Sequence, residues 1–166
     1  MQRKIFDAQV QLIRTMINKY KISPQDTQIG VVVYGGRQVT TAIDLEQYDD
    51  KTTLLTGLDR IRNLGKPVGD TGVGFGVNEA ILMFRRTKKD AFQQRLITFF
   101  DGKPKFDIGR LAMELKKDSV ESIAVGVGEN ADKGDIETLS PDGKGIIVND
   151  ADQLDGIAGS LEKPGQ

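Results

Sequence analysis

Asp101 is the first residue of this sequence to examine for chemistry. It follows an apolar run, Leu96 to Phe100, that the Asp101-Gly102 pair ends. Such a run is typical of a strand buried on both faces, and a carboxylate directly after it would stand at the mouth of the sheet. Ligands of open parallel sheets bind beyond the carboxyl ends of the strands, which makes Asp101 a candidate binding residue. The same pair is also an ordinary turn signal, and the dipeptide alone leaves both interpretations open.

Thr71 is a second candidate, within the glycine-dense segment from Leu64 to Gly76. A loop of this kind can present backbone amides to a phosphate. No Gly-Lys-Ser/Thr follows, however, and the segment comes after a predicted helix, whereas the dinucleotide fingerprint requires a strand. Thr71 instead offers a hydroxyl at the N-terminus of a helix. Capping that helix is at least as common a role for such a residue as ligand binding.

Two acidic segments resemble calcium loops without having the required spacing. The polar loop from Glu129 to Asp135 lacks the helix-loop-helix pattern and has no glutamate at the bidentate position. The segment from Asp150 to Asp155 also misses the alternate spacing, and Asp152 and Asp155 fit the outer face of a last helix better. We therefore expect a solvated loop over Glu129 to Asp135 and no calcium site in either segment.

The composition excludes several classes of catalyst and partner. The 166 residues contain no cysteine and no histidine, which rules out thiolate nucleophiles, cysteine-based zinc sites and histidine-assisted triads within the chain. The formal net charge is −1 and the charges are scattered, so we expect no nucleic-acid partner. No apolar run approaches the roughly 20 residues of a membrane span. Binding must come from a local site.

The elements that would position Thr71 and Asp101 alternate between helix and strand. The sequence predicts helices over Phe6–Tyr20, Lys51–Arg62, a segment through Val77 and Phe84, a segment after an Asp107 cap, Ile136–Leu139 and Leu154–Leu161. It predicts strands over Ile29–Tyr34, Gln38–Leu45, Leu96–Phe100, Ser122–Val127 and Ile146–Val148. The first strand should be buried on both faces, and the second should be its exposed edge partner. This alternation predicts an α/β doubly wound sheet with helices on both faces. One domain over residues 1–162 would leave 163–166 as a linker or tail.

The order and spacing of these segments resemble a von Willebrand factor A domain. The likeness is carried by Ile29–Tyr34, Leu45–Leu64, Gly69-Asp70-Thr71, Leu96–Gly102 and Ile123–Gly128, and it covers nearly the whole chain. The closest similarity is to extracellular-matrix members of the matrilin and collagen VI type. The resemblance implies a Rossmann-like, mostly parallel sheet with one antiparallel edge strand. It also implies a secreted, non-enzymatic adhesion module that binds a protein ligand, with collagen or another matrix protein as the candidate.

The resemblance further implies a metal-ion-dependent adhesion site at the upper edge of the sheet. In the family, an Asp-x-Ser-x-Ser run, a threonine and an aspartate hold a divalent cation, usually magnesium, and an acidic residue of the partner can complete its coordination. Thr71 matches the threonine and Asp101 matches the aspartate. The surrounding ligand face would include Tyr34, Gly35, Asp70 and Gly102.

The Asp-x-Ser-x-Ser run is absent from this sequence, as is the strand that precedes it in the family. By the resemblance, that strand lies in the middle of the sheet, between Ile29–Tyr34 and Leu96–Phe100. At most two oxygen ligands are left, too few for a tight magnesium site. Phe100 also stands where relatives commonly carry threonine. We therefore expect weak or incomplete metal binding.

The missing strand also bears on stability. Buried backbone groups left without partners cost roughly 1–3 kcal/mol each, against about 5–15 kcal/mol of stability for a whole domain. We expect that the sequence is a fragment of a longer polypeptide, or that a strand from another chain complements the sheet, with self-association as one route.

Two other functions stay open on the sequence. An intracellular A domain that serves as a scaffold or complex-assembly subunit is the main alternative. A nucleotide-binding or hydrolytic enzyme could use Asp70 and Asp101 around a metal, but no nucleophile and base accompany them.

Overall fold

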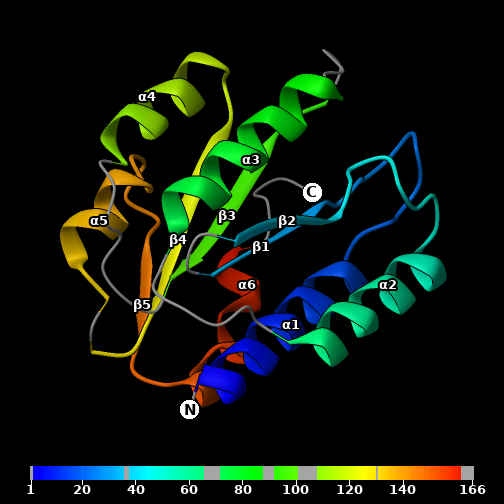
Figure 1. Ribbon diagram of the computed structural model, residues 1–166, viewed down its shortest axis with the longest axis horizontal. Helices are drawn as coiled ribbons and strands as arrows, with labels where there is room; N and C mark the ends of the chain where they lie inside the picture. The colour runs from blue at the N-terminus through cyan, green and yellow to red at the C-terminus, as the bar shows by residue number, and fades with distance from the viewer. Residues whose placement is uncertain are drawn as a thin grey trace.

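The chain forms two small sheets, with helices packed on both faces, in a computed structural model (Figure 1). The structure describes residues 2–35, 38–65, 72–87, 92–100, 108–129 and 131–161, except for the side chains of residues 2 and 100. None of the helices in these ranges is both long and apolar enough to cross a membrane.

The first sheet is a hairpin of two antiparallel strands, as the sequence predicted. It consists of β1 (Val31–Gly35) and β2 (Gln38–Ile43), and α1 (Gln2–Asn18) and α2 (Lys51–Leu64) pack on one face. Val33 lies opposite Thr40 in the register. Asp50 caps α2, as expected, because its side chain accepts a hydrogen bond from the Thr53 amide at 2.9 Å.

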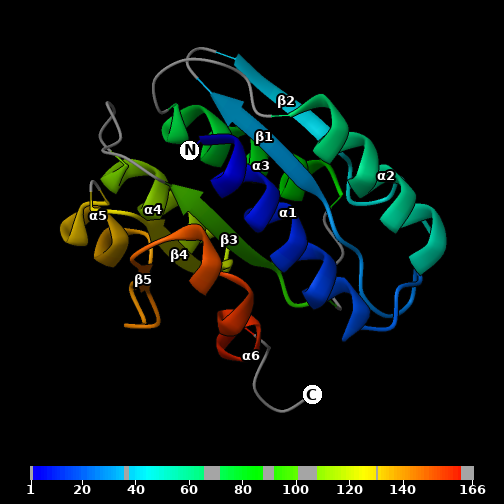
Figure 2. The ribbon, with the colours of Figure 1, turned by 90° about the horizontal axis from the view of Figure 1, so that it is seen from below.

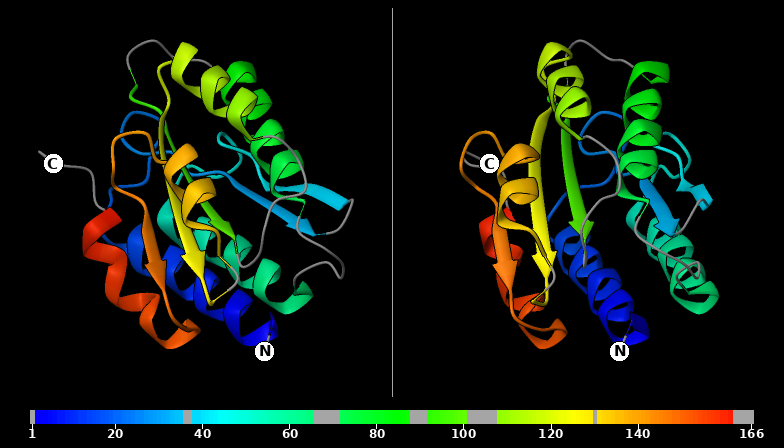
Figure 3. Two further views of the ribbon diagram at one scale, coloured as in Figure 1. Left: turned by 90° about the vertical axis from the view of Figure 1, so that its left-hand side faces the viewer. Right: turned by 60° about the vertical axis from the view of Figure 1, so that its left-hand side comes forward.

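The second sheet is parallel, with the strand order β3-β4-β5. Its strands are β3 (Arg95–Phe100), β4 (Glu121–Val127) and β5 (Ile146–Val148). One face carries α3 (Val73–Arg86), α4 (Gly109–Lys117) and α5 (Lys133–Thr138), and the other carries α1 and α6 (Ala158–Leu161), as Figures 2 and 3 show. This arrangement confirms the predicted α/β class.

The C-terminal segment differs from the single helix that the sequence predicted. Two 3-10 turns, η1 (Ala151–Gln153) and η2 (Asp155–Ile157), come before the short α6. Asp150 caps the first turn by accepting from the Asp152 amide, and Gly156 and Gly159 weaken helix propagation. Leu154 and Leu161 are still buried as expected.

A gap separates the two sheets, because β1 pairs with β2 and β3 pairs with β4 but no ladder joins β1 to β3. β1 and β3 point in the same direction (Figures 2 and 3). For the part of the chain that the structure describes, this confirms the prediction that a central strand is missing. The expectation that Ile29–Tyr34 is buried on both faces was wrong, because its side chains are only half-buried. β4 has neighbours on both sides and is buried from Ser122 to Val127.

Helix α1 lies across this gap and packs on both sheets. Val10 belongs to the core between α1, α2 and the first sheet, while Leu12 belongs to the core over β4 and β5. On the opposite face, α3 contacts β1, β2 and β3. These two helices therefore cover the space between the sheets.

Candidate functional site

Several elements begin or end at the carboxyl edge of the sheets. Tyr34 and Gly35 end β1, and the Tyr34 ring lies against the first turn of α3, where a Cβ on Gly76 would come within 2.8 Å of Cδ1 of the ring. The first turn of α1 reaches the same edge, because Lys4 Nζ lies 3.3 Å from a carboxylate oxygen of Asp152, which follows β5. The ends of β1 and β3 therefore share this edge with the starts of α1 and α3 (Figure 3).

Of the predicted site residues, Tyr34 and Gly35 lie at this edge. Asp70, Thr71, Asp101 and Gly102 lie outside the described residues. Their described neighbours in the chain are Gly72, which caps α3, and Phe100, which ends β3.

The chemistry of the available donors does not make a complete cation site. Within the described ranges, no group of three acidic side chains is close enough together to hold a metal ion. The sequence also lacks the Asp-x-Ser-x-Ser run, which leaves one carboxylate and one hydroxyl, Asp101 and Thr71. Magnesium requires near-octahedral oxygen coordination, so these two residues need further ligands.

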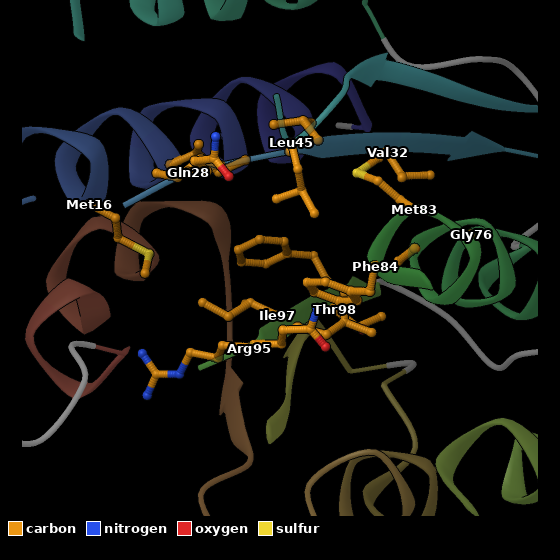
Figure 4. Close-up of a pocket in the computed structure, with 18 of the residues that line it drawn as sticks. Met16, Gln28, Val32, Leu45, Gly76, Met83, Phe84, Arg95, Ile97 and Thr98 are labelled. Atoms are coloured by element: carbon orange, nitrogen blue, oxygen red, sulfur yellow. The ribbon is translucent and has the colours of Figure 1, made fainter. Parts of the chain in front are cut away.

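A cavity of about 410 Å³ lies between β1 and β3. Its walls are mainly apolar and include Val10 from α1, Val33 from β1, Ala80 and Phe84 from α3, and Ile97 from β3. Figure 4 shows side chains from these elements surrounding the space. The cavity therefore occupies the place of the missing strand.

Tyr34 crosses the carboxyl end of this cavity. Its hydroxyl donates a hydrogen bond to the backbone carbonyl oxygen of Phe99. On the other side of β3, the carbonyl of Gln94 accepts from the Glu121 amide of β4. Because the backbone groups of successive strand residues point to opposite sides, Ile97 and Phe99 turn their N–H and C=O groups toward the cavity.

Two polar side chains on β3 each have a buried atom that makes no hydrogen bond within the described residues. They are Thr98, through its hydroxyl oxygen, and Arg95, through Nε. Arg95 also donates to the Leu161 carbonyl and lies 3.4 Å from Glu121. Thr98 was not among the residues predicted from the sequence, although a hydroxyl in an otherwise apolar strand is a signal that could have identified it.

Two pKa shifts lie away from the predicted ligands. The pKa of Asp26, which lines the cavity, is lowered chiefly by a hydrogen bond from the Ser23 hydroxyl. Hydrogen bonds to Asp118 and Glu114 raise the pKa of Arg85 and connect α3 to α4. Both pairings are structural, because neither supplies a nucleophile and a base.

A comparison with known families identifies the family that has this architecture. The von Willebrand factor type A domain profile matches residues 1–159. The chain belongs to this family. Among curated proteins, it is 26% identical over 129 residues to human von Willebrand factor A domain-containing protein 2, covering 76% of this chain and 17% of that protein. It is 27% identical over 124 residues to the Xenopus laevis collagen alpha-1(XXI) chain, covering 74% of this chain and 12% of that one.

The fold of this von Willebrand factor A domain is shared with proximal thread matrix protein 1 from the mussel byssus. The TM-score is 0.82 at 19% identity, over 95% of this chain and 40% of that one. Another structure of the mussel protein, with zinc in its MIDAS motif, has a TM-score of 0.81 at 20% identity, over 93% of this chain and 39% of that one. This domain thus spans less than a fifth of the two curated relatives and about two fifths of the mussel protein.

Proposed function

We propose that this von Willebrand factor A domain is a non-enzymatic adhesion module of an extracellular matrix or cell-surface protein. It binds a protein partner, with collagen as the first candidate, at the carboxyl edge of the sheets. The observation that carries the proposal is the convergence of β1, β3, α1 and α3 at that edge. The collagen chain and the byssus matrix protein among its relatives support a matrix role. The lack of histidine and cysteine fits a binding role.

The proposed ligand face is an incomplete metal-ion-dependent adhesion site. Thr71 and Asp101 supply a hydroxyl and a carboxylate oxygen to Mg²⁺, since hard oxygen donors suit this cation. The remaining ligands come from water, from the partner's carboxylate or from polypeptide outside residues 1–166. The surrounding face consists of Tyr34, Gly35, Asp70 and Gly102.

Immobilised collagen provides a direct test. We expect residues 1–166 to bind it in the presence of Mg²⁺, and Asp101→Ala or EDTA to weaken binding by tenfold or more, about 1.4 kcal/mol. The matched control is Asp142→Ala, which removes an exposed carboxylate from the loop before β5, at the opposite edge of the sheet. Binding that is indifferent to both EDTA and Asp101→Ala removes the metal from the proposal. Absence of binding to collagen and to a panel of other matrix proteins removes the adhesion role.

A further inference from the structure

We propose that Arg3 on α1 and Arg62 on α2 form a binding site for a carboxylate from an acidic peptide segment of a partner protein. The first turn of α1 reaches the carboxyl edge of the sheets, and the last turn of α2 lies beside it, because Arg3 donates to the Arg62 carbonyl (Figures 1 and 2). This inference does not rest on the proposed adhesion function, since two guanidinium groups bind a carboxylate without a metal.

The two guanidinium groups share one carboxylate of the chain itself. Arg3 Nε lies 3.2 Å from Oδ1 of Asp7, and Arg62 Nε lies 4.0 Å from the same oxygen. The Arg3 and Arg62 side chains are 57% and 50% exposed, so both remain accessible from solvent. Two positive charges against one negative charge leave one positive charge at this surface for a partner to neutralise.

Most of the N–H donors of these two side chains are available to a ligand. Each guanidinium group carries five N–H donors. Within the described residues, the one hydrogen bond that either group donates runs from Arg3 to the Arg62 backbone carbonyl oxygen, at 2.9 Å. The Oδ1 atom of Asp7 is buried and accepts no hydrogen bond from them there. A carboxylate that approaches from solvent can therefore accept from both groups, in the bidentate geometry that suits a planar guanidinium.

The Arg3 side chain is held in place before a partner binds. Gly65, the C-cap of α2, has a φ of 78°, and a Cβ built on it would lie 2.6 Å from a terminal nitrogen of the Arg3 guanidinium. The guanidinium thus rests directly against Gly65, next to the Arg62 carbonyl and Asp7. A side chain that is already held loses less conformational entropy on binding.

The excess of positive charge on α1 is confined to this cluster. Arg14 pairs one to one with Asp59, and Lys4 pairs one to one with Asp152. A polyanion such as a sulfated polysaccharide is held by several unpaired cations in a row. A single unit of excess charge, carried by two neighbouring guanidinium groups, fits one carboxylate better.

The ion cluster around Arg85 has the opposite balance of charge. Its guanidinium lies between Glu114 at 2.5 Å and Asp118 at 2.8 Å. Two carboxylates already neutralise that one cation, so a further carboxylate would be repelled. An exposed arginine is therefore not enough to make a site of this kind, and the ratio of two cations to one anion is what distinguishes Arg3 and Arg62.

The test uses residues 1–166 in EDTA and the blocked peptide acetyl-Gly-Leu-Glu-Leu-Gly-amide, whose glutamate is its one carboxylate. We expect the Nε–H NMR signals of Arg3 and Arg62 to shift saturably as the peptide is added, because these groups gain a charged acceptor. The matched peptide with glutamine in place of glutamate should leave both signals unchanged. EDTA keeps the result independent of the Mg²⁺-dependent collagen binding proposed above.

Variants of the protein assign the site to these two side chains. Arg3→Gln and Arg62→Gln should each weaken binding of the glutamate peptide by about fivefold, as expected for loss of one exposed charge pair, and the signal of the remaining arginine reports the binding. Arg60→Gln is the matched control, because Arg60 is an exposed cation of α2 that makes no ion pair within the described residues. Backbone amide spectra that match the wild type away from α1 and α2 show that each variant is folded.

Three outcomes would overturn the proposal. Equal shifts with the glutamate and glutamine peptides would show that no carboxylate is recognised. Equal weakening by Arg60→Gln and Arg62→Gln would show a general effect of net charge. Heparin that saturates the Arg3 and Arg62 signals at a lower concentration than the glutamate peptide would assign the site to a sulfated polysaccharide.

Discussion

The Tyr34 hydroxyl donates a hydrogen bond to the carbonyl oxygen of Phe99 across the cavity between the two sheets. The two residues are 65 positions apart and belong to strands that no ladder joins. In a continuous sheet this carbonyl would accept from the amide of a neighbouring strand. A side chain supplies the donor here, so the bond ties the sheets together where backbone pairing does not.

Tyr34→Phe tests how much this hydrogen bond contributes to stability. Removing the hydroxyl leaves the Phe99 carbonyl without its donor, and we expect the free energy of unfolding in urea to fall by about 1 kcal/mol. Tyr48→Phe is the control, because the Tyr48 hydroxyl makes no hydrogen bond within the described part of the chain. An equal loss in both variants would mean that the Tyr34 bond contributes nothing specific.

Gly76→Ala should disturb the same bridge from the side of α3. A Cβ at Gly76 would lie 2.8 Å from Cδ1 of the Tyr34 ring, so the ring has to move away from Phe99. Overpacking of this kind costs about 1–3 kcal/mol, which exceeds the gain of up to ~1 kcal/mol from placing alanine in a helix. Urea unfolding should show a net loss of stability.

Gly159→Ala provides the matched control in α6. No atom lies within 4 Å of a Cβ built on Gly159, so the helix gain of about 0.5–1 kcal/mol should appear undiminished. If Gly76→Ala were as stabilising as Gly159→Ala, the close packing of Tyr34 on α3 would be wrong.

Thr98→Val should stabilise the isolated chain. The Thr98 hydroxyl is buried without a partner in the described ranges, and valine has nearly the same shape without the desolvated oxygen. We expect the free energy of unfolding to rise by about 1 kcal/mol. A decrease would show that the hydroxyl has a hydrogen-bond partner.

Ser140→Ala should lower the free energy of unfolding, because the Ser140 hydroxyl does have a hydrogen-bond partner. The Ser140 hydroxyl oxygen accepts from the Ala124 amide at 2.6 Å, just before β5 begins to pair with β4 at Val125. The variant leaves that buried amide unpaired, so we expect a loss of about 1–3 kcal/mol in urea unfolding. A neutral Ser140→Ala would contradict the role of Ser140 as a substitute for a ladder partner.

The features that sequence predicted well are those that local chemistry decides. Asp50 caps α2 because a carboxylate three residues before an amide can reach it in any fold. The gap between β1 and β3 followed from the order of segments and the family resemblance, and the structure confirms it. Asp70, Thr71, Asp101 and Gly102 remain predictions, because they lie outside the described residues.

The features that sequence did not predict depend on distant neighbours. The apolar run at β1 shows that the strand suits burial on both faces, but its actual half-burial depends on the cavity beside it. The Tyr34–Phe99 bridge joins residues that no local pattern connects. Thr98 became visible as an unsatisfied group only when its surroundings were known.

A hydrogen bond from Ser23 lowers the pKa of Asp26, and this predicts how the stability of the fold depends on pH. The Ser23 hydroxyl donates to the Asp26 carboxylate at 2.6 Å, the largest cause of the lowered pKa, and the charge of Lys21 adds a smaller effect. A carboxyl group whose pKa is lowered on folding stabilises the fold above its unfolded pKa, near 3.8, and loses that contribution as pH falls through the folded pKa.

Ser23→Ala should therefore raise the pKa of Asp26 toward 3.8, and Lys21→Gln should raise it less. An NMR titration of the Asp26 carboxyl carbon measures both shifts. The Ser23 oxygen also accepts from the amides of Gln25 and Asp26, so the variant loses some stability at every pH. The extra loss should appear near neutral pH and vanish in acid, where the carboxyl is protonated in both proteins. A stability difference between wild type and Ser23→Ala that stays constant with pH would assign the whole effect to the two backbone contacts.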